Sequence, residues 1–250
     1  MNSFIDLSKE NIETEHVCCA ISDKKHQKGV KLKKEWLTAR MEEGHTFRKL
    51  DAKGKVFIEY APLEKAWVPV IGKNYYYIYC LWVSGSYKGK GYGKQLLESC
   101  IAKAKEEGKS GVCILSSKKK TPFLSDKAFL TKYDFKVVAT YRETYELLAL
   151  SFDGSLPAFS HSLEEELPYS EELVIYYTHQ CPYIHNCISQ VVSYAEEKNI
   201  DLKLIHVDTL EKAKNLPSVF NNWAVFYKGQ FETVHLLNKG FLDKLITKKN

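Results

Sequence analysis

The sequence predicts a protein of the α/β (α+β) class with two domains. A strand too apolar to be half exposed, NYYYIYCLWVS at 74–84, runs directly into a glycine-rich loop and a helix. The last third of the chain has the order strand–helix–strand, followed by two strands and a helix. Residues 153–171, between these parts, are rich in Pro, Ser and Glu without sustained periodicity. We therefore expect a first domain at 1–152, a linker at 153–171 and a second domain at 172–250.

Hydrophobic periodicity predicts a mixed central sheet flanked by helices in the first domain. Helices are expected where apolar residues recur at helical spacing, at 29–44, 96–108 and, in a shorter form, 126–135. Strands are expected in runs of β-branched and aromatic residues, at 3–8, 45–51, 55–62, 74–84, 110–116, 135–143 and 144–152. The second and third of these strands flank AKG, which is typical of a hairpin.

The second domain is predicted to be smaller, with a βαβ unit followed by ββα. Its strands are expected at 172–178, 201–208, 223–229 and 230–237, the last two as a hairpin. Its helices are expected at 188–199, at 209–216 and at 241–249.

The composition is that of a folded protein without a targeting segment. Of the 250 residues, 44% are hydrophobic and 27% are charged. The N-terminus lacks a basic segment followed by an apolar one, and no run of apolar residues is long enough to span a membrane. The seven cysteines are an odd number, which favours free thiols in a reducing compartment. We expect a cytoplasmic protein.

The net charge of +5 does not indicate a nucleic-acid partner. The basic residues are scattered among acidic ones, and no basic motif interleaved with aromatic residues is present. We therefore expect no nucleic acid and no membrane as partners, and interpret the charge as solvated surface, except at one loop.

That loop, YKGKGYGKQLL at 87–97, places three glycines and three lysines where a strand ends and a helix begins. Free backbone N–H groups and the positive end of the helix dipole make such a place an anion site. The phosphate loop of nucleoside triphosphatases is excluded, because Gln95 stands where that motif has Ser or Thr. The dinucleotide fingerprint is excluded too, because its third glycine would be Lys94.

The loop resembles the acyl-coenzyme A loop of the GNAT superfamily of N-acetyltransferases. That pattern is Arg or Gln, two residues, Gly, one residue, then Gly or Ala, and the matching residues here are Lys88, Gly89, Lys90, Gly91, Tyr92 and Gly93. The similarity covers about residues 3–150. Four stretches, HVCCAISD, KLDAKGKVFIEY, NYYYIYCLWVSGSYKGKGYGKQLLESCI and KKKTPFLSDKAFL, resemble the YoaP-type acetyltransferases, which carry a small C-terminal thioredoxin-like domain.

The resemblance implies acetyl transfer from acetyl-CoA to an amine by direct attack. Backbone N–H groups of 88–93 would hold the pyrophosphate, and Lys88, Lys90 and Lys94 would add positive charge. A backbone N–H among Leu81, Trp82 and Val83 would polarise the thioester carbonyl. Ser125, with Asp126 beside it, takes the place of a helix-start Asn that contacts the coenzyme in the family.

The groups that move protons are less clearly marked in the sequence. The tyrosine that protonates the departing thiolate in many GNAT enzymes is replaced by Leu130, and Asp134 stands at the family's glycine. Tyr133, one helical turn on, could take that role or be packed in the core. Glu59, between apolar neighbours in a strand, is the candidate general base because burial would raise its pKa, although it could instead face solvent.

Other candidates carry no distinguishing feature. His45, Tyr60 and His16 could also act as bases. We interpret Cys18 and Cys19 as small core residues. The first helices and the hairpin, where GNAT proteins bind acceptors, supply Trp36, Trp67 and the tyrosines at 75, 76, 77 and 79, which suit a core and a groove equally well.

Cys181 is placed at the start of the first helix of the second domain, where the helix dipole lowers a thiol pKa. The sequence around it resembles the CPYC of glutaredoxins, but the second cysteine is replaced by Ile184. Cys187 lies about 9 Å further along the helix, so a disulfide between the two is awkward. A zinc site from His179, Cys181, His185 and Cys187 matches no standard spacing, and we expect no metal.

Three functions follow from these observations. The first is an acetyl-CoA-dependent N-acetyltransferase acting on a small amine or on an amino group of a peptide or protein. The second is a CoA-binding module without turnover, favoured by Leu130. The third is a thiol-redox protein that uses Cys181. The second domain is most simply a module that binds the acceptor or a partner.

Overall fold

The structure, a computed structural model, describes residues 3–17, 19–21, 23–164, 167 and 171–249. Its N-terminal half is built on a seven-stranded sheet. In spatial order its strands are β1 (Phe4–Asp6), β2 (Thr46–Leu50), β3 (Val56–Pro62), β5 (Tyr75–Val83), β6 (Gly111–Ser117), β8 (Tyr145–Ser151) and β7 (Lys136–Tyr141). All neighbours are antiparallel except β5 and β6, which run parallel. The predicted mixed central sheet is confirmed.

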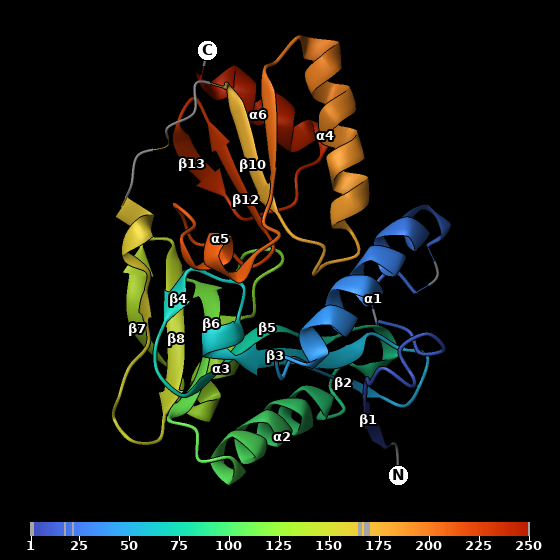
Figure 1. The fold of residues 1–250 in the computed structure, drawn as a ribbon, viewed down its shortest axis with the longest axis vertical. Coiled ribbons are helices and arrows are strands. Elements are labelled where there is room, and N and C mark those ends of the chain that lie inside the picture. Colours follow the sequence, from blue (N-terminus) through green and yellow to red (C-terminus); the bar gives the residue numbers. More distant parts are fainter. Residues whose placement is uncertain (1–2, 18, 22, 165–166, 168–170, 250) are drawn as a thin grey trace.

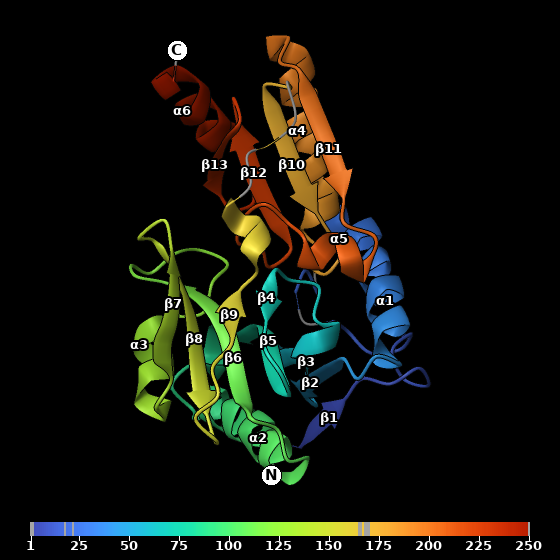
Figure 2. The same ribbon diagram turned by 60° about the vertical axis from the view of Figure 1, so that its left-hand side comes forward.

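Helices cover both faces of this sheet (Figures 1 and 2). The helix α2 (Tyr92–Glu106) packs on one face and α1 (Gln27–Met41) on the other, while α3 (Lys127–Leu130) joins the α2 side. The two faces follow from alternation along β5, because successive side chains of a strand point to opposite sides. Tyr75, Tyr77 and Tyr79 contribute to the core under α1, and Tyr76 and Ile78 to the core over α2.

The structure places in the core the six aromatic residues that the sequence left open between a core and a groove. The four tyrosines of β5 are at most 4% exposed, Trp36 is 8% exposed and Trp67 is 4% exposed. All six are core residues. Short elements complete this half, namely β4 (Val70–Ile71) and the 3-10 helices at Lys24–His26, Leu63–Lys65, Gly85–Tyr87 and Thr131–Tyr133.

The C-terminal half contains a four-stranded sheet. Its strands, in spatial order, are β11 (Leu202–His206), β10 (Leu173–Tyr177), β12 (Trp223–Tyr227) and β13 (Gln230–Thr233). The pair β10–β11 is parallel and the other pairs are antiparallel. Apolar side chains of α4 (Ile184–Lys198) and α6 (Lys239–Lys249) pack on one face, while α5 (Leu210–Lys214) packs on the other. The predicted order, βαβ followed by ββα, is confirmed.

The two halves share one apolar cluster. The face of the larger sheet that carries α1 also receives Val174, Tyr176 and Phe226 from the smaller sheet. In Figure 1 the orange and red C-terminal half stands directly above this face, and α2 lies on the opposite side of the larger sheet. The C-terminal half therefore packs on the larger sheet as an additional layer.

Polar groups at this junction are paired across it. The side chain of Asn221 donates to the carbonyl of Tyr79 at 2.9 Å and accepts from the hydroxyl of Tyr77 at 3.1 Å. The ammonium of Lys214 donates to the carbonyls of Leu63 at 2.7 Å and Val70 at 2.9 Å. These bonds give partners to main-chain carbonyls at the edge of the apolar cluster, where a buried polar group without a partner costs free energy.

The segment predicted to be a linker is partly ordered by pairing. Within it, β9 (Ala158–Phe159) pairs antiparallel with β4, and a 3-10 helix follows at His161–Glu164. Two helices begin a full turn earlier than predicted, α2 at Tyr92 and α4 at Ile184. No helix in the described part of the chain is both long and apolar enough to cross a bilayer.

The junction can be tested with Asn221→Ala. We expect this change to lower the free energy of unfolding by about 1–3 kcal/mol, because it leaves the buried Tyr79 carbonyl without its donor. The free energy is measured by urea denaturation. Asn215→Ala, at an exposed position after α5, is the matched control and should change it by less than about 0.5 kcal/mol. Equal effects of the two changes would contradict the description of the junction.

Candidate active site

The glycine loop between β5 and α2 has the conformation of an anion-binding turn. Gly89 has φ 74° and Gly91, the N-cap of α2, has φ 81°, both in the left-handed region that favours glycine. A side chain at Gly89 would meet nothing within 4 Å, so this part of the loop faces open space. The first turn of α2 holds no acidic residue and has no side-chain cap. Its N–H groups are therefore directed at the space in front of the loop.

Positive charge surrounds this space. Lys88, Lys90 and Lys94 are exposed. The ammonium of Lys90 lies 6.0 Å from the centre of the Tyr87 ring, and that of Lys94 lies 3.7 Å from a carboxylate oxygen of Glu98. Charged side chains on a flexible stem can rearrange around a bound anion at little cost.

The strands β5 and β6 separate on the side of the loop. Their parallel pairing runs from Tyr75 and Gly111 only as far as Ile78 and Ile114. Beyond this point β5 continues to Val83 and β6 to Ser117, each still paired to its other neighbour. The register between β3 and β5 shifts here, because Glu59 pairs with Cys80 and Tyr60 with Ile78, so β5 carries one extra residue, Tyr79. The segment Leu81–Val83 therefore presents an edge to the opening, and Trp82 is 46% exposed there.

The loop, the strand end and α3 meet at the base of the opening. A side chain at Gly93 would lie 3.6 Å from the Phe129 ring and 3.7 Å from the Val83 side chain. The carbonyl of Ser125 accepts from the hydroxyl of Ser116 at 2.7 Å, and Asp126 caps α3 by accepting from the amide of Ala128 at 2.9 Å. The structure thus brings the predicted residues of β5, the loop and the start of α3 together.

Tyr133 lies at the end of the 3-10 helix that follows α3. Its ring packs on Phe129, with the ring centres 5.1 Å apart, and it is partly exposed. Leu130, at the family's tyrosine position, is fully buried. Asp134 has φ 63°, a conformation that glycine adopts more easily and that explains the family's glycine at this place.

Glu59 does not have the properties predicted for a general base. Its side chain is 0% exposed. One carboxylate oxygen lies 2.9 Å from Nε2 of His45, and the other accepts from Lys33 at 2.6 Å and from the side chain of Gln180 at 2.8 Å. Burial alone raises the pKa of Glu59, but Lys33 and His45 outweigh it and lower the pKa to about 2. The expectation of a raised pKa was wrong, because the partners of the carboxylate were not visible in the local sequence.

Lys33 and Gln180 were missed by the sequence analysis. The ammonium of Lys33 also donates to the main-chain carbonyl of Gln180 at 2.6 Å. Lys33 lies between Val30 and Leu37 in the apolar stripe of α1, and this charge in an apolar stripe was a usable signal. Gln180, in a turn far along the chain, carried no such signal.

The other candidate bases are buried or lie close to a main-chain carbonyl. His45 is buried between Trp36 and Tyr79, with ring centres 5.1 and 5.0 Å away, and burial lowers its pKa. Tyr60 is buried, and burial raises its pKa. The Nε2 atom of His16 lies 2.8 Å from the carbonyl of Ala52, and burial lowers its pKa. Cys18 lies outside the described residues.

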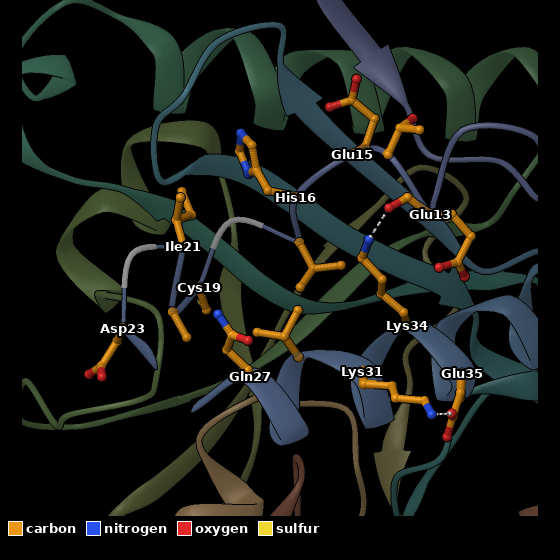
Figure 3. A pocket seen from close by; sticks show the side chains of 14 residues that line it. Glu13, Glu15, His16, Cys19, Ile21, Asp23, Gln27, Lys31, Lys34 and Glu35 are labelled. Carbon is orange, nitrogen blue, oxygen red and sulfur yellow. Dashed lines mark hydrogen bonds and ion pairs between the residues drawn. The ribbon is translucent and has the colours of Figure 1, made fainter. Parts of the chain in front are cut away.

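A cavity of about 420 Å³ lies between the segment 13–23 and α1. Figure 3 shows Cys19 and Ile21 on one wall and Gln27 on the other. The side chains of Lys34 and Lys31 are engaged at its far end, with the main-chain carbonyl of Glu13 at 2.7 Å and with the carboxylate of Glu35 at 3.9 Å (Figure 3). A second lining carboxylate, that of Glu15, is paired with Lys49 at 2.7 Å.

Cys181 was expected to have a low pKa, and this expectation was wrong. The residue precedes α4 by three positions, and burial raises the pKa of its thiol to about 12. Cys187, inside α4, donates its thiol hydrogen to the carbonyl of Leu237 at 3.1 Å, and burial raises its pKa to about 12 as well. Both thiols are free. Within the described residues, no three His, Cys, Asp or Glu side chains are arranged to hold a metal ion.

Comparison with known proteins agrees with this fold and loop. The profile of the acetyltransferase (GNAT) family matches residues 10–121, and that of the YoaP-like family matches residues 201–244. The protein named uncharacterized N-acetyltransferase YoaP from Bacillus subtilis (strain 168) is 38% identical over 245 residues, which cover 97% of this chain and 98% of that protein.

Among solved structures, an N-acetyltransferase from Staphylococcus aureus Mu50 aligns with a TM-score of 0.41 at 15% identity, over 60% of this chain and 98% of that one. The PaiA N-acetyltransferase from Thermoplasma acidophilum, in complex with coenzyme A, aligns with a TM-score of 0.41 at 21% identity, over 60% and 99%.

The similarity to the YoaP protein, together with the family profile, defines the class as GNAT acetyltransferases. The chain belongs to the N-acetyltransferases of this family, in the group of the YoaP protein, because the similarity to that protein extends over nearly the whole of both chains. The resemblance on which the expected fold and activity class rested is therefore confirmed.

The buried ion pair can be tested with Lys33→Met. We expect this change to lower the free energy of unfolding by about 3–5 kcal/mol, because it leaves the Glu59 carboxylate buried without its cation. Adding Glu59→Gln to Lys33→Met should restore a large part of the loss. Both variants are measured by urea denaturation, with Lys31→Met, an exposed position on the same helix, as the control.

The pH dependence of stability provides a second readout of the same change. Glu59 has a pKa of about 2 in the folded protein and a usual value of 4.5. Its contribution is therefore fully present above pH 4.5 and lost as the pH falls toward 2. We expect Lys33→Met to flatten this part of the stability curve. An unchanged curve, or a loss no larger than that of Lys31→Met, would contradict the description of the pair.

Proposed function

We propose that the protein transfers the acetyl group of acetyl-CoA to an amine by direct attack. The observation that carries the proposal is the glycine loop, with Gly89 and Gly91 in left-handed conformations at the place where β5 has separated from β6. The chain's membership in the N-acetyltransferases supports the proposal, because acetyl transfer is the reaction for which that family is named.

The loop would bind the pyrophosphate of the coenzyme. The loop faces open space at Gly89, and the N-terminus of α2, where anions are stabilised, has no side-chain cap. Among residues 88–93, the N–H of Lys88 already donates to the carbonyl of Gly85 at 3.2 Å, so the N–H groups that follow it would bind the anion. Lys88, Lys90 and Lys94 would neutralise the remaining phosphate charge. Lys88 stands where the family has Arg or Gln, so it supplies charge without the planar fork of a guanidinium.

The open edge of β5 would hold the pantetheine arm and the thioester. Beyond Ile78 this edge no longer pairs with β6, so its backbone groups can pair with an extended ligand. A backbone N–H of Leu81, Trp82 or Val83 would then polarise the thioester carbonyl and stabilise the oxyanion that forms on attack. Ser125 and Phe129 would flank the arm from the α3 side.

Tyr133 would protonate the departing thiolate of coenzyme A. It is the tyrosine nearest to the family's position that keeps partial exposure, whereas Leu130 at that position is closed off. Glu59 would not deprotonate the acceptor, because both of its oxygens are engaged and no solvent reaches them. We assign Glu59 a structural role, in which its partners hold β3 and β5 in place.

The cavity between 13–23 and α1 is our candidate for the acceptor amine. Glu13, Glu15 and Asp23 line it and would favour an ammonium group. Its wall residue Cys19 packs against the same apolar cluster as Cys80, the residue before Leu81. The acceptor would be a small amine or the end of a peptide.

A second function, a CoA-binding module without turnover, is favoured by the burial of Leu130 and Glu59. The two functions differ in one observable. Acetylated product, detected by mass spectrometry after incubation with acetyl-CoA and a library of amines and peptides, excludes the second. Binding of acetyl-CoA without any product supports it. The thiol-redox alternative is disfavoured because burial raises the pKa of Cys181.

The loop is tested with Gly91→Val. We expect the dissociation constant for acetyl-CoA, measured by titration calorimetry, to rise about tenfold or more, because a branched side chain at φ 81° must shift the backbone N–H groups. Gly108→Val, at φ 64° after the end of α2 with open space around it, carries the same local strain and should leave binding unchanged. Equal binding by Gly91→Val and the wild type would refute the proposed loop.

The proton donor is tested with Tyr133→Phe. We expect the kcat for acetyl transfer to fall about 100-fold while acetyl-CoA still binds, since a positioned acid accelerates such a step by about 10²–10⁴. Ile101→Val, at a partly buried position on α2 in the same apolar cluster, controls for packing. If the kcat of Tyr133→Phe stayed within about twofold of the wild-type value, Tyr133 would be a packing residue.

A further inference from the structure

A lysine of the N-terminal half and a tyrosine of the C-terminal half meet near the end of β5. The hydroxyl of Tyr183, the residue before α4, accepts from the ammonium of Lys55 at 3.4 Å and from the main-chain amide of Ala20 at 3.2 Å. The start of α4 lies beside α1 in Figure 1. Three segments that are distant in the chain are thus joined at one phenolic oxygen.

The strand register places Lys55 on the face of the larger sheet that carries α1. Lys55 precedes β3, and its carbonyl accepts from the amide of Ser84 at 3.0 Å, so Lys55 stands opposite Ser84 as Phe57 stands opposite Trp82. The side chain of Val56 belongs to the core on the α2 side, and that of Phe57 to the core under α1. Because side chains alternate along a strand, Lys55 and Trp82 are diagonal neighbours on the α1 face, a separation that long side chains can bridge.

This position separates Lys55 from the coenzyme loop. The helix α2, whose N-terminus follows the loop, packs on the opposite face of the sheet. Trp82 is one of the residues whose backbone N–H we propose for the thioester carbonyl, and its exposed side chain shares the face of Lys55. A group bound by Lys55 would therefore lie across the sheet from the pyrophosphate and near the acetyl group. The position suits the acceptor rather than the coenzyme.

Both side chains have hydrogen-bond donors to spare. Lys55 is half-buried, and among the described residues no carboxylate is paired with it. The Tyr183 hydroxyl accepts two bonds, and within the described part of the chain it donates to no protein group. The Tyr183 ring is held edge-on against His26, with ring centres 4.7 Å apart. An ammonium and a hydroxyl side by side suit a carboxylate, whose bonds to a charged donor are stronger than neutral ones.

We propose that Lys55 and Tyr183 bind the carboxylate of the acceptor, and that the acceptor is a free amino acid rather than a simple amine. The inference rests on the proposed acetyl transfer and narrows its substrate class. The cavity between 13–23 and α1 adjoins the pair, because Ala20, whose amide binds Tyr183, lines it. This cavity would hold the rest of the amino acid. The C-terminal half would then contribute a specificity-determining residue to the acceptor site.

The test measures ligand binding to the full chain by titration calorimetry, with and without coenzyme A, so that no turnover occurs. The probes are free amino acids with apolar, aromatic, acidic and basic side chains, each compared with its carboxamide. The carboxamide keeps the shape and the ammonium group but lacks the negative charge. We expect the amino acid that binds best to have a dissociation constant at least about tenfold below that of its carboxamide, because hydrogen bonds to a charged group are lost.

Two changes should remove this difference. Lys55→Met and Tyr183→Phe are each expected to raise the dissociation constant for the amino acid about tenfold. The constants for the carboxamide and for acetyl-CoA should stay within about twofold, because neither ligand needs the pair. Lys53→Met, at an exposed position in the same turn, is the matched control and should bind all three ligands as the wild type does.

The inference is overturned if the wild-type protein binds the amino acid and the carboxamide equally, or binds neither. Weaker binding of acetyl-CoA by Lys55→Met also overturns it, because the lysine would then serve the coenzyme. The comparison of ligands on the wild-type protein decides even where a variant fails to fold.

Failure of the proposed function gives a different result. If the amino acid bound as expected but no acetylated product formed with acetyl-CoA, acetyl transfer would be refuted and the carboxylate site would stand. If carboxamides were acetylated with the same kcat/KM as the amino acids, acetyl transfer would stand and the carboxylate site would be refuted.

Discussion

The buried carboxylate of Glu59 is the interaction on which the arrangement of the two halves depends. It belongs to the larger sheet, yet its partners are Lys33 from α1 and Gln180 from the turn after β10. A charge without solvent costs several kcal/mol unless its partners are all present. The helix, the sheet and the C-terminal half must therefore adopt the one relative position in which these donors meet. The shared apolar cluster holds the two halves together, and the partners of the Glu59 carboxylate fix their relative position.

The same constraint acts on the candidate active site through β5. Glu59 stands beside the register shift between β3 and β5 and opposite Cys80, just past the point where β5 parts from β6. The part of β5 before this point is core and is paired on both sides. The part after it ends in the glycine loop and has one open edge. The position of Glu59 therefore determines where β5 stops being a core strand and begins to line the candidate active site. The C-terminal half is therefore connected to the candidate active site through the hydrogen bond of Gln180 to Glu59.

The sequence predicted what depends on neighbouring residues. The strand at 74–84, the glycine loop and the order of elements were readable because periodicity and glycine placement are local properties. The partners of Glu59 were not, since they are 26 and 121 residues away in the chain. The pKa of Cys181 was misjudged for the same reason: its distance from the helix start is local, but its burial arises from packing against α1. The pairing of β9 with β4 likewise joins two segments that are far apart in the chain.

The most direct test of the account is to map the backbone amide shifts of the labelled protein during titration with acetyl-CoA. The account predicts that the largest changes occur at residues 88–94 and at 81–83, because the coenzyme is held by main-chain N–H groups of the loop and by the open edge of β5. Smaller changes are expected near Ser125 and Phe129. Changes confined to the C-terminal half, or to the segment 13–23 with the glycine loop unaffected, would contradict it.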